Sequence, residues 1–304
     1  MSFSHDIADY PEGIVIAVDK PYRWTSADVI RKLKYAAIKH FGKKNLKVGH
    51  AGTLDPLATG VLLVCIGNAC KRAQELQDHD KEYIARIRFG ATTPSYDLEK
   101  DVDRTFPFSH ITADAVRAAL PAFLGEQEQV APLFSAKSVD GLRAYELARK
   151  LYRSGRFSEL DAAALDTLQR NRIVISELEL LDFIPDETNV AESSALPTPP
   201  TGFASGPLPL TRPRVATDSA TSVFSGTTAS SRINVADTSG MGLPEAVIRI
   251  ACSKGTYIRA FARDLGEALG SGAHLAGLIR SRSGSYRLED ALSLEEALSL
   301  FAPI

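Results

Sequence analysis

The stretch GHAGTLDPLATGVL, residues 49–62, surrounds one carboxylate with glycine, threonine and aliphatic side chains. It contains three glycines, two threonines and a single acid, Asp55, and its only other titratable side chain is His50. Asp followed by Pro is typical of a helix start, with the Asp as N-cap and the Pro at the first helical position. A rigid turn of this kind can also present a carboxylate to a substrate as a nucleophile. The two interpretations are compatible, and the stretch alone leaves both open.

The composition indicates a globular protein of the reducing cytoplasm. The 304 residues are enough for one large domain or two ordinary ones, and 44% of them are hydrophobic and 24% charged. The three cysteines form no CxxC pair, which argues against a disulfide framework or a zinc site. The start, MSFSHDIADYPEG, is too polar for a signal peptide, and the longest apolar run, residues 61–66, is too short to span a membrane.

Basic residues are concentrated in two segments, although the net charge is −2. Between Lys20 and His50 there are nine Lys or Arg residues and one acid, and between Arg249 and Arg287 there are seven and two acids. Two such segments could form one basic face that binds nucleic acid. The alternative is that both are solvated helix faces.

The pattern of apolar residues predicts strands that alternate irregularly with helices. We expect a mixed α+β fold with a central, largely antiparallel sheet flanked by helices. The helix over residues 26–41 would have Ser26 as N-cap and end before Gly42, and the helix over 112–125 would break near Pro121. The remaining expected elements are strands at 13–21, 82–90, 172–183 and 246–255 and a helix at 256–270.

Residues 184–244 differ in composition from the rest of the chain. They hold eight of the sixteen prolines, are rich in Ser, Thr, Ala and Gly, and show no sustained period. Such a segment cannot bury enough apolar surface to offset the entropy lost on ordering, so we predict a disordered insertion. We expect one domain over residues 1–304, folded over about 10–183 and 245–304, with the strands at 172–183 and 246–255 as neighbours.

Five segments, in this order, carry a resemblance to a known family. They are DKPYRWTSADV (19–29), KVGHAGTLDPLATGVLLVCIGNACK (47–71), KEYIARIRFGATTPSYDLEKD (81–101), QVAPLFSAKSVDGLRAYELARK (129–150) and CSKGTYIRAFARDLGEAL (252–269). Together they resemble the TruB family of pseudouridine synthases. The resemblance implies the pseudouridine synthase fold with an active-site cleft. It also implies an isomerase that converts uridine 55 in the T arm of tRNA into pseudouridine. This enzyme would act as a monomer, without a cofactor or a metal and without binding a membrane.

The resemblance also implies roles for six residues. Asp55 would be the catalytic nucleophile, paired with Arg259, and Tyr83 would stack on the flipped target base. Tyr257 would lie beside them in the pocket. Leu278 would form part of the apolar wall, and His50 would fill the space that the flipped nucleotide vacates.

The chemistry of the reaction agrees with a single carboxylate. It could attack the ribose at C1′ or the base at C6, and the sequence does not choose between these routes. A hydrolase of glycosidic bonds normally needs two carboxylates that flank the bond, and the sequence offers only one in a motif. The HExxH, GxSxG and phosphate-loop motifs of other enzyme classes are absent from the sequence. The alternative function is a non-catalytic RNA-binding or RNA-chaperone module on the same fold.

Two departures from the family pattern stand out. Arg23 stands where the family usually has Gly, and it would either alter the first turn or add a phosphate contact. The chain ends soon after residue 290, so we expect no C-terminal RNA-binding domain of the kind that many bacterial members carry.

Overall fold

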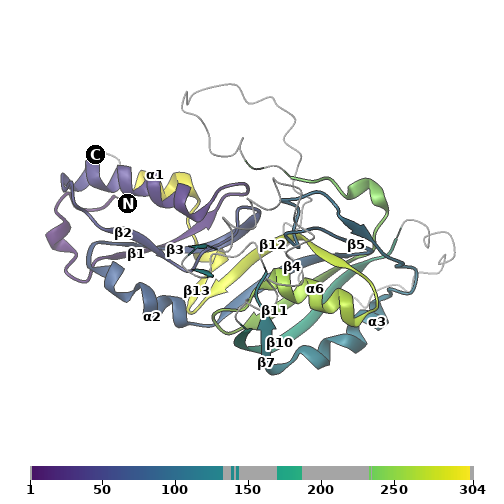
Figure 1. Ribbon diagram of the computed structural model, residues 1–304. Helices are drawn as coiled ribbons and strands as arrows, with labels where there is room; N and C mark the ends of the chain where they lie inside the picture. The colour runs from purple at the N-terminus through teal and green to yellow at the C-terminus, as the bar shows by residue number, and fades with distance from the viewer. Residues whose placement is uncertain are drawn as a thin grey trace, which may run out of the picture.

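A long mixed sheet forms the centre of the computed structural model, which describes residues 2–132, 138–139, 142–143, 170–186, 233 and 235–301 (Figure 1). Among the described strands of this sheet only β3 and β12 pair in parallel, so the sheet is largely antiparallel, as the sequence predicts. Its order is β1 (Ile14–Lys20), β3 (Ala58–Ile66), β12 (Ala273–Ser283), β4 (Lys81–Phe89), β11 (Glu245–Cys252), β10 (Arg170–Ile184) and β7 (Gly125–Val130). Two further strands join this sheet beside the path: β2 (Val48–Ala51) pairs with β3, and β13 (Tyr286–Arg287) pairs with β12. Strands β5 (Ala91–Thr92) and β6 (Arg104–Thr105) form a separate two-stranded sheet. Strands β8 (Ser138–Val139) and β9 (Leu142–Arg143) pair with each other.

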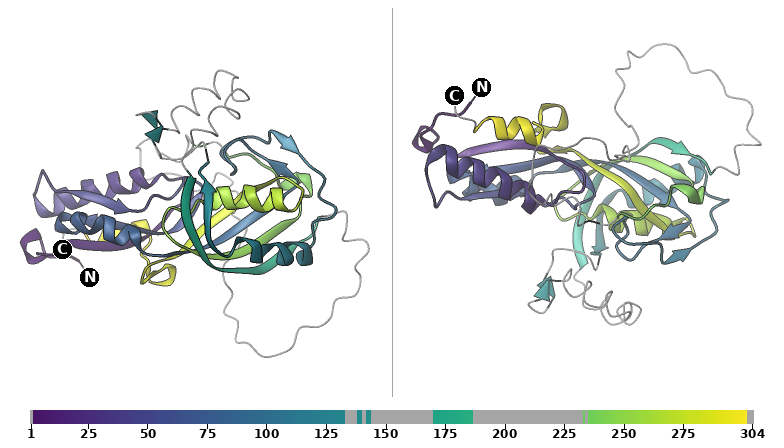
Figure 2. Two further views of the ribbon diagram at one scale, coloured as in Figure 1. Left: turned by 60° about the horizontal axis from the view of Figure 1, so that its bottom comes forward. Right: turned by 90° about the horizontal axis from the view of Figure 1, so that it is seen from above.

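Helices cover both faces of the sheet (Figure 2). Alternate residues of β1, β3 and β4 form one core with α1 (Ser26–Phe41), α3 (Ala113–Ala119), α6 (Ile258–Ala268) and α7 (Leu294–Ser299). The intervening residues of β3 form a second, smaller core with α2 (Ala73–Asp78). The register carries one face continuously from β1 to β4, because Val18 lies opposite Leu62 and Leu278 lies between Ala58 and Ala85. Helices α1 and α6 therefore lie on the same face.

The N-cap of helix α1 lies one residue earlier than the sequence predicts. Thr25, not Ser26, is the N-cap, because Thr25 and Asp28 form a capping box. Ser26 is instead buried, and its hydroxyl bonds both the N–H and the carbonyl of Leu54. Gly42 closes the helix in the left-handed conformation, as expected. The three cysteines are free thiols.

The predicted insertion begins after β10, but its final part belongs to the fold. β10 and β11 pair along their length, which confirms that the two predicted strands are neighbours. Residues 235–244 are placed, and Ala236, Thr238 and Leu243 are buried, so the boundary at residue 244 is wrong. Most of the predicted insertion, residues 187–232, lies outside the described residues.

Asp55 lies in a tight turn between β2 and β3. The Ala58 N–H donates to the Asp55 carbonyl at 3.1 Å, and β3 starts at Ala58, so of the two interpretations of the Asp-Pro step the helix start is wrong. The local Asp-Pro signal is overridden because β3 pairs with β1, β2 and β12. Buried groups hold the turn from several sides: Arg280 donates to the Gly52 carbonyl at 3.1 Å, and the Arg23 N–H donates to the Pro56 carbonyl at 3.0 Å.

Lys20 is a fully buried cation beneath this turn. Its Nζ donates to the carbonyls of Pro21, Trp24 and Pro56, at 2.9, 2.6 and 3.2 Å. Burial lowers the pKa of Lys20 to about 7, although the carboxylate of Asp55 opposes that change. Lys20 therefore links the end of β1 to the backbone next to Asp55.

Gly60 is the glycine of this stretch that the fold constrains most. Its φ is +98°, and a Cβ there would lie 2.3 Å from the Arg280 carbonyl oxygen. Gly60→Ala should lower the free energy of unfolding by about 3 kcal/mol in chemical denaturation. Gly49→Ala is the matched control, since nothing lies within 4 Å of its Cβ, and it should change stability by less than about 1 kcal/mol. Equal losses in the two variants would contradict this explanation.

Lys20 should titrate near pH 7 in the folded protein, as followed by the NMR shift of its Cε. The unfolded chain keeps the ordinary pKa of 10.5, so between these values the native state has lost a proton that the unfolded state retains. The free energy of unfolding should therefore rise with pH across this window, by up to about 1.4 kcal/mol per pH unit. A Cε midpoint near 10.5 would show that Lys20 is not desolvated as described.

Candidate active site

The centre of the site is an ion pair between Asp55 and Arg259. Arg259 Nε donates to Asp55 Oδ2 at 2.8 Å, and Nη2 donates to Oδ1 at 3.1 Å, so the guanidinium bonds both carboxylate oxygens in a bidentate pair. The Arg259 side chain is 5% exposed, whereas that of Asp55 is 37% exposed. Of the two partners, the carboxylate is therefore the group that an incoming molecule can reach.

Arg259 is positioned by the first turn of helix α6. The residue before the helix, Tyr257, has no side-chain cap of its own. Gln129, buried in β7, accepts from the Tyr257 N–H at 2.8 Å and donates to the Tyr257 carbonyl at 3.2 Å. Arg259 Nη1 also donates to the Ser95 carbonyl at 3.1 Å, which fixes the orientation of the guanidinium plane.

A second carboxylate, that of Asp97, also lies close to the Arg259 guanidinium. Its Oδ2 is 3.8 Å from Arg259 Nε, and its side chain is 7% exposed. Burial raises the pKa of Asp97, the Arg259 charge opposes this, and the Asp55 charge adds to it. Burial also raises the pKa of Glu99, to about 7, with a further rise from Asp97. Asp97 is therefore a buried carboxylate and not a solvated one.

Burial alone would lower the pKa of Arg259, but the three carboxylates of Asp55, Asp97 and Glu99 outweigh it. The net shift is upward, so Arg259 stays charged. No regular motif in the sequence marks Asp97. Its only signal is that it lies in one of the segments that carry the family resemblance.

A small cavity opens beside the ion pair, with a volume of about 20 Å³. That is room for about one water molecule, so any larger group could reach Asp55 only from its exposed side. Three of the six predicted site residues, Asp55, Arg259 and Leu278, line the cavity. Its other lining residues are Leu57, Ala58, Asp97, Leu98, Leu275, Ala276 and Gly277.

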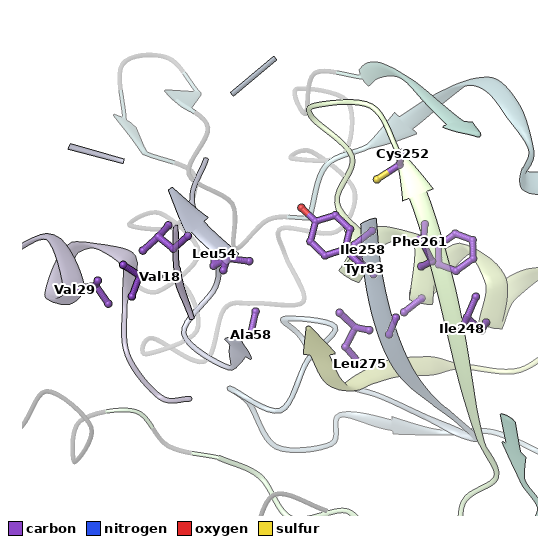
Figure 3. Packing of buried hydrophobic residues seen from close by; sticks show 14 of the residues in the cluster. Val18, Val29, Leu54, Ala58, Tyr83, Ile248, Cys252, Ile258, Phe261 and Leu275 are labelled. Carbon is purple, nitrogen blue, oxygen red and sulfur yellow. The ribbon is translucent and has the colours of Figure 1, made fainter. Parts of the chain in front are cut away.

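Tyr83 lies in the core next to the site and is 9% exposed. Its ring packs near Ile258, and its hydroxyl points toward the side of the molecule that carries Leu54 (Figure 3). Burial raises the pKa of Tyr83, while the neighbouring Arg280 charge lowers it. Tyr83 is therefore a neutral aromatic group at the edge of the site and not part of the cavity lining.

His50 and Tyr257 also lie outside the cavity lining. His50 is half-buried in β2, and burial, followed by the Arg280 charge, lowers its pKa. Its Nδ1 has no hydrogen-bond partner among the described residues. Tyr257 is half-buried at the start of α6, and its backbone is held by Gln129.

The two basic segments have different surroundings. In the first, seven side chains are exposed on α1 and the loop that follows it: Arg31, Lys32, Lys34, Lys39, Lys43, Lys44 and Lys47. In the second, Arg259 and Arg280 are buried, and Arg249 pairs with Glu82, Glu177 and Glu179. Lys254 and Arg287 of the second segment are exposed, but the first segment offers the longer row of exposed cations.

No helix in the described part of the chain combines the length and apolar character that a membrane crossing requires.

Arg23 adopts the left-handed conformation, with φ of +64°, which accounts for the glycine that the family usually has there. Its side chain donates to the Ile233 carbonyl at 2.7 Å. Arg23 thus contacts a segment that the sequence places in the insertion.

A family model and individual relatives both indicate the same family. Residues 38–191 match the model of the TruB family pseudouridylate synthase, N-terminal domain. A tRNA pseudouridine synthase B of Phocaeicola vulgatus is 45% identical over 287 residues, which covers 94% of this chain and 92% of that protein. Its counterpart in Flavobacterium johnsoniae is 36% identical over 294 residues, covering 95% of this chain and 98% of that protein.

Solved structures share the fold at lower identity. A Cbf5–Nop10–Gar1 complex contains a chain that matches with a TM-score of 0.53 and 21% identity, over 96% of this chain and 56% of that one. An H/ACA RNP bound to a substrate RNA containing 2′-deoxyuridine matches with a TM-score of 0.51 and 20% identity, over 95% of this chain and 53% of that one. This chain thus spans just over half the length of those two chains.

The long mixed sheet and the extent of the sequence match lead to one family. This chain belongs to the TruB family of pseudouridylate synthases.

Proposed function

We propose that this protein converts one uridine in the T arm of tRNA into pseudouridine, with Asp55 as the nucleophile. The observation that carries the proposal is the asymmetry of the central ion pair. Arg259 is buried and held in place, while the Asp55 carboxylate is bound by it on both oxygens and is still 37% exposed. A fixed guanidinium holds a nearby carboxylate in one orientation while the exposed side of the carboxylate stays open to the RNA.

The reaction rearranges bonds within one nucleotide and needs no external reductant or oxidant. The N1–C1′ bond breaks, the uracil turns, and C5 bonds to C1′. The proton on C5 then leaves, and N1 gains a proton, so the product is an isomer of the substrate. Asp55 can open this sequence by forming a bond to C1′ or to C6, and this bond breaks again before the product leaves, so the carboxylate is regenerated.

The target base has to leave its stack to reach Asp55, which costs a few kcal/mol. Tyr83 is the aromatic group that would receive it, and stacking on such a ring contributes about 1–3 kcal/mol per base. Leu278, on the cavity wall, would contact the apolar face of the same base. His50 and Tyr257 complete the proposed site from β2 and from the start of α6.

Helix α1 offers the surface for the RNA backbone. It begins beside Leu54, next to the Asp55 turn, and its 16 residues extend about 24 Å from there. Exposed lysines continue along it and into the following loop, at Lys34, Lys39 and Lys43 among others. Phosphates of the tRNA that flank the target nucleotide would bind there.

We also propose that residues 1–304 act as one catalytic domain and as a monomer in the cytoplasm. One continuous sheet carries residues from both sides of the site, with Asp55 before β3 and Arg259 in the helix after β11. The site is thus assembled within one chain.

Asp55→Asn should abolish pseudouridine formation on an unmodified tRNA transcript, because a neutral amide cannot attack carbon. Wild-type protein should yield pseudouridine at the T-arm uridine, mapped by chemical labelling of the product. Affinity of the variant for tRNA should stay within about tenfold of wild type, because the exposed lysines of α1 are unchanged.

The same experiment separates the alternatives. Binding of tRNA by the wild type without any pseudouridine would favour the non-catalytic RNA-binding module. Pseudouridine formed by Asp55→Asn at the wild-type rate would overturn Asp55 as nucleophile. Pseudouridine at another position in the tRNA would overturn the T-arm assignment alone.

A further inference from the structure

A short segment at the end of the predicted insertion lies across the edge of the active site. We call Ile233 together with residues 235–238 the strap. The strap is not part of the sheet, and its residues are separated from Asp55 by more than 170 positions in the sequence. It nevertheless contacts both sides of the cavity.

One end of the strap is anchored to the sheet. Thr238 is 2% exposed, and its hydroxyl accepts from Arg88 Nη1 at 2.7 Å. Arg88 also bonds the buried carboxylate of Glu245, at 2.8 Å, together with Arg86. A buried, fully bonded network of this kind gives the strap a rigid attachment.

The middle of the strap packs on the cavity wall. The Ala236 N–H donates to the Leu98 carbonyl at 2.8 Å. Ala236 forms an apolar cluster with Leu57 and Leu98, and both of these leucines line the cavity beside Asp55. Ile233 and Val235 pack against the same cluster.

The other end of the strap is held by Arg23. Arg23 Nη2 donates to the Ile233 carbonyl at 2.7 Å, and the Arg23 N–H donates to the Pro56 carbonyl at 3.0 Å. One residue therefore bonds the strap with its side chain and the Asp55 turn with its backbone. Arg23 does this at a cost, because its φ is +64° and its buried Nε has no partner among the described residues.

We propose that Arg23 and the strap form a clamp that fixes the Asp55 turn against the Leu98 side of the cavity, which makes Arg23 a positioning residue for the reaction. The clamp joins the Asp55 turn to the Leu98 wall of the cavity, and a displacement of about 1 Å at a reacting group can cost about a hundredfold in rate. Backbone strain and an unpaired buried Nε destabilise the fold, and such features persist where the surrounding structure holds the conformation in place. This inference rests on the proposed function for its catalytic consequence, but the clamp itself is a property of the fold.

The alternative for Arg23 is a phosphate contact. Arg23 is half-buried, and its Nη2 is already engaged by the Ile233 carbonyl. A residue that binds phosphate acts on tRNA affinity and on its salt dependence. A positioning residue acts on the rate of the bound complex, so the two roles give different measurements.

The test uses Arg23→Gly, Arg23→Lys, Ala236→Pro and the double variant Arg23→Gly/Ala236→Pro in the full chain. Glycine accepts the left-handed backbone without strain, so Arg23→Gly removes the side chain while keeping the fold. Ala236→Pro removes the N–H that bonds Leu98. Met241→Ala is the matched control, because Met241 is exposed in the same region and has no part in the clamp.

Arg23→Gly should reduce the single-turnover rate on tRNA about tenfold, with the dissociation constant for tRNA within about threefold of wild type. Amide hydrogen exchange in residues 53–58 should speed up, and Arg23→Lys should restore part of both effects, since it keeps one donor. Ala236→Pro should act similarly, and the double variant should be no worse than the stronger single one, because both break the same clamp. Met241→Ala should match wild type.

Unchanged exchange in residues 53–58 and an unchanged rate in Arg23→Gly would overturn the clamp. Weaker tRNA binding at an unchanged rate would also overturn it, in favour of a phosphate contact. If wild-type protein formed no pseudouridine, the proposed function would fail, and the exchange comparison would then decide the clamp by itself.

Discussion

The pairing of Asp55 with Arg259 is the interaction on which the rest of the site depends. Arg259 is 5% exposed, and a buried guanidinium has to be matched by negative charge and hydrogen-bond acceptors. Asp55, Asp97 and the Ser95 carbonyl supply them from two different parts of the chain. The consequence is a carboxylate that is bound, oriented and still open to solvent on one side.

The fold is arranged so that Asp55 cannot move independently of the sheet. Lys20 and Arg23 both donate to the Pro56 carbonyl, Ser26 bonds Leu54, and Arg280 bonds the Gly52 carbonyl. Gly60 allows β3 to pass close to Arg280, where any side chain would clash with the backbone. A carboxylate on such a turn is held in one position before any substrate arrives.

Local sequence signals predicted the elements well where the elements are amphipathic. The strand at β4 and the end of α1 at Gly42 follow from alternation and from the glycine that the left-handed cap requires. The helix-start interpretation of the Asp-Pro step at residue 55 fails because its signal is local, whereas β3 is fixed by three neighbouring strands. The N-cap was misplaced by one residue because Ser26 bonds Leu54, a contact that no local pattern encodes.

The site was only partly predictable for a similar reason. Asp55, Arg259 and Leu278 came from the family resemblance, and they do meet at one cavity. Asp97 and Arg280 were missed because each looks like an ordinary surface charge until the tertiary structure buries it. The second basic segment misled in the same way, since Arg249 is paired with three glutamates that lie on β4 and β10.

The most direct test of the central ion pair is the single-turnover rate of pseudouridine formation by Arg259→Lys, measured alongside its affinity for tRNA. Lysine keeps the positive charge but cannot bond both oxygens of Asp55 as a planar fork. The rate should fall by at least about a hundredfold, with tRNA affinity within about threefold of wild type. A rate close to that of wild type would contradict the claim that the two-point grip of Arg259 on Asp55 prepares the carboxylate for reaction.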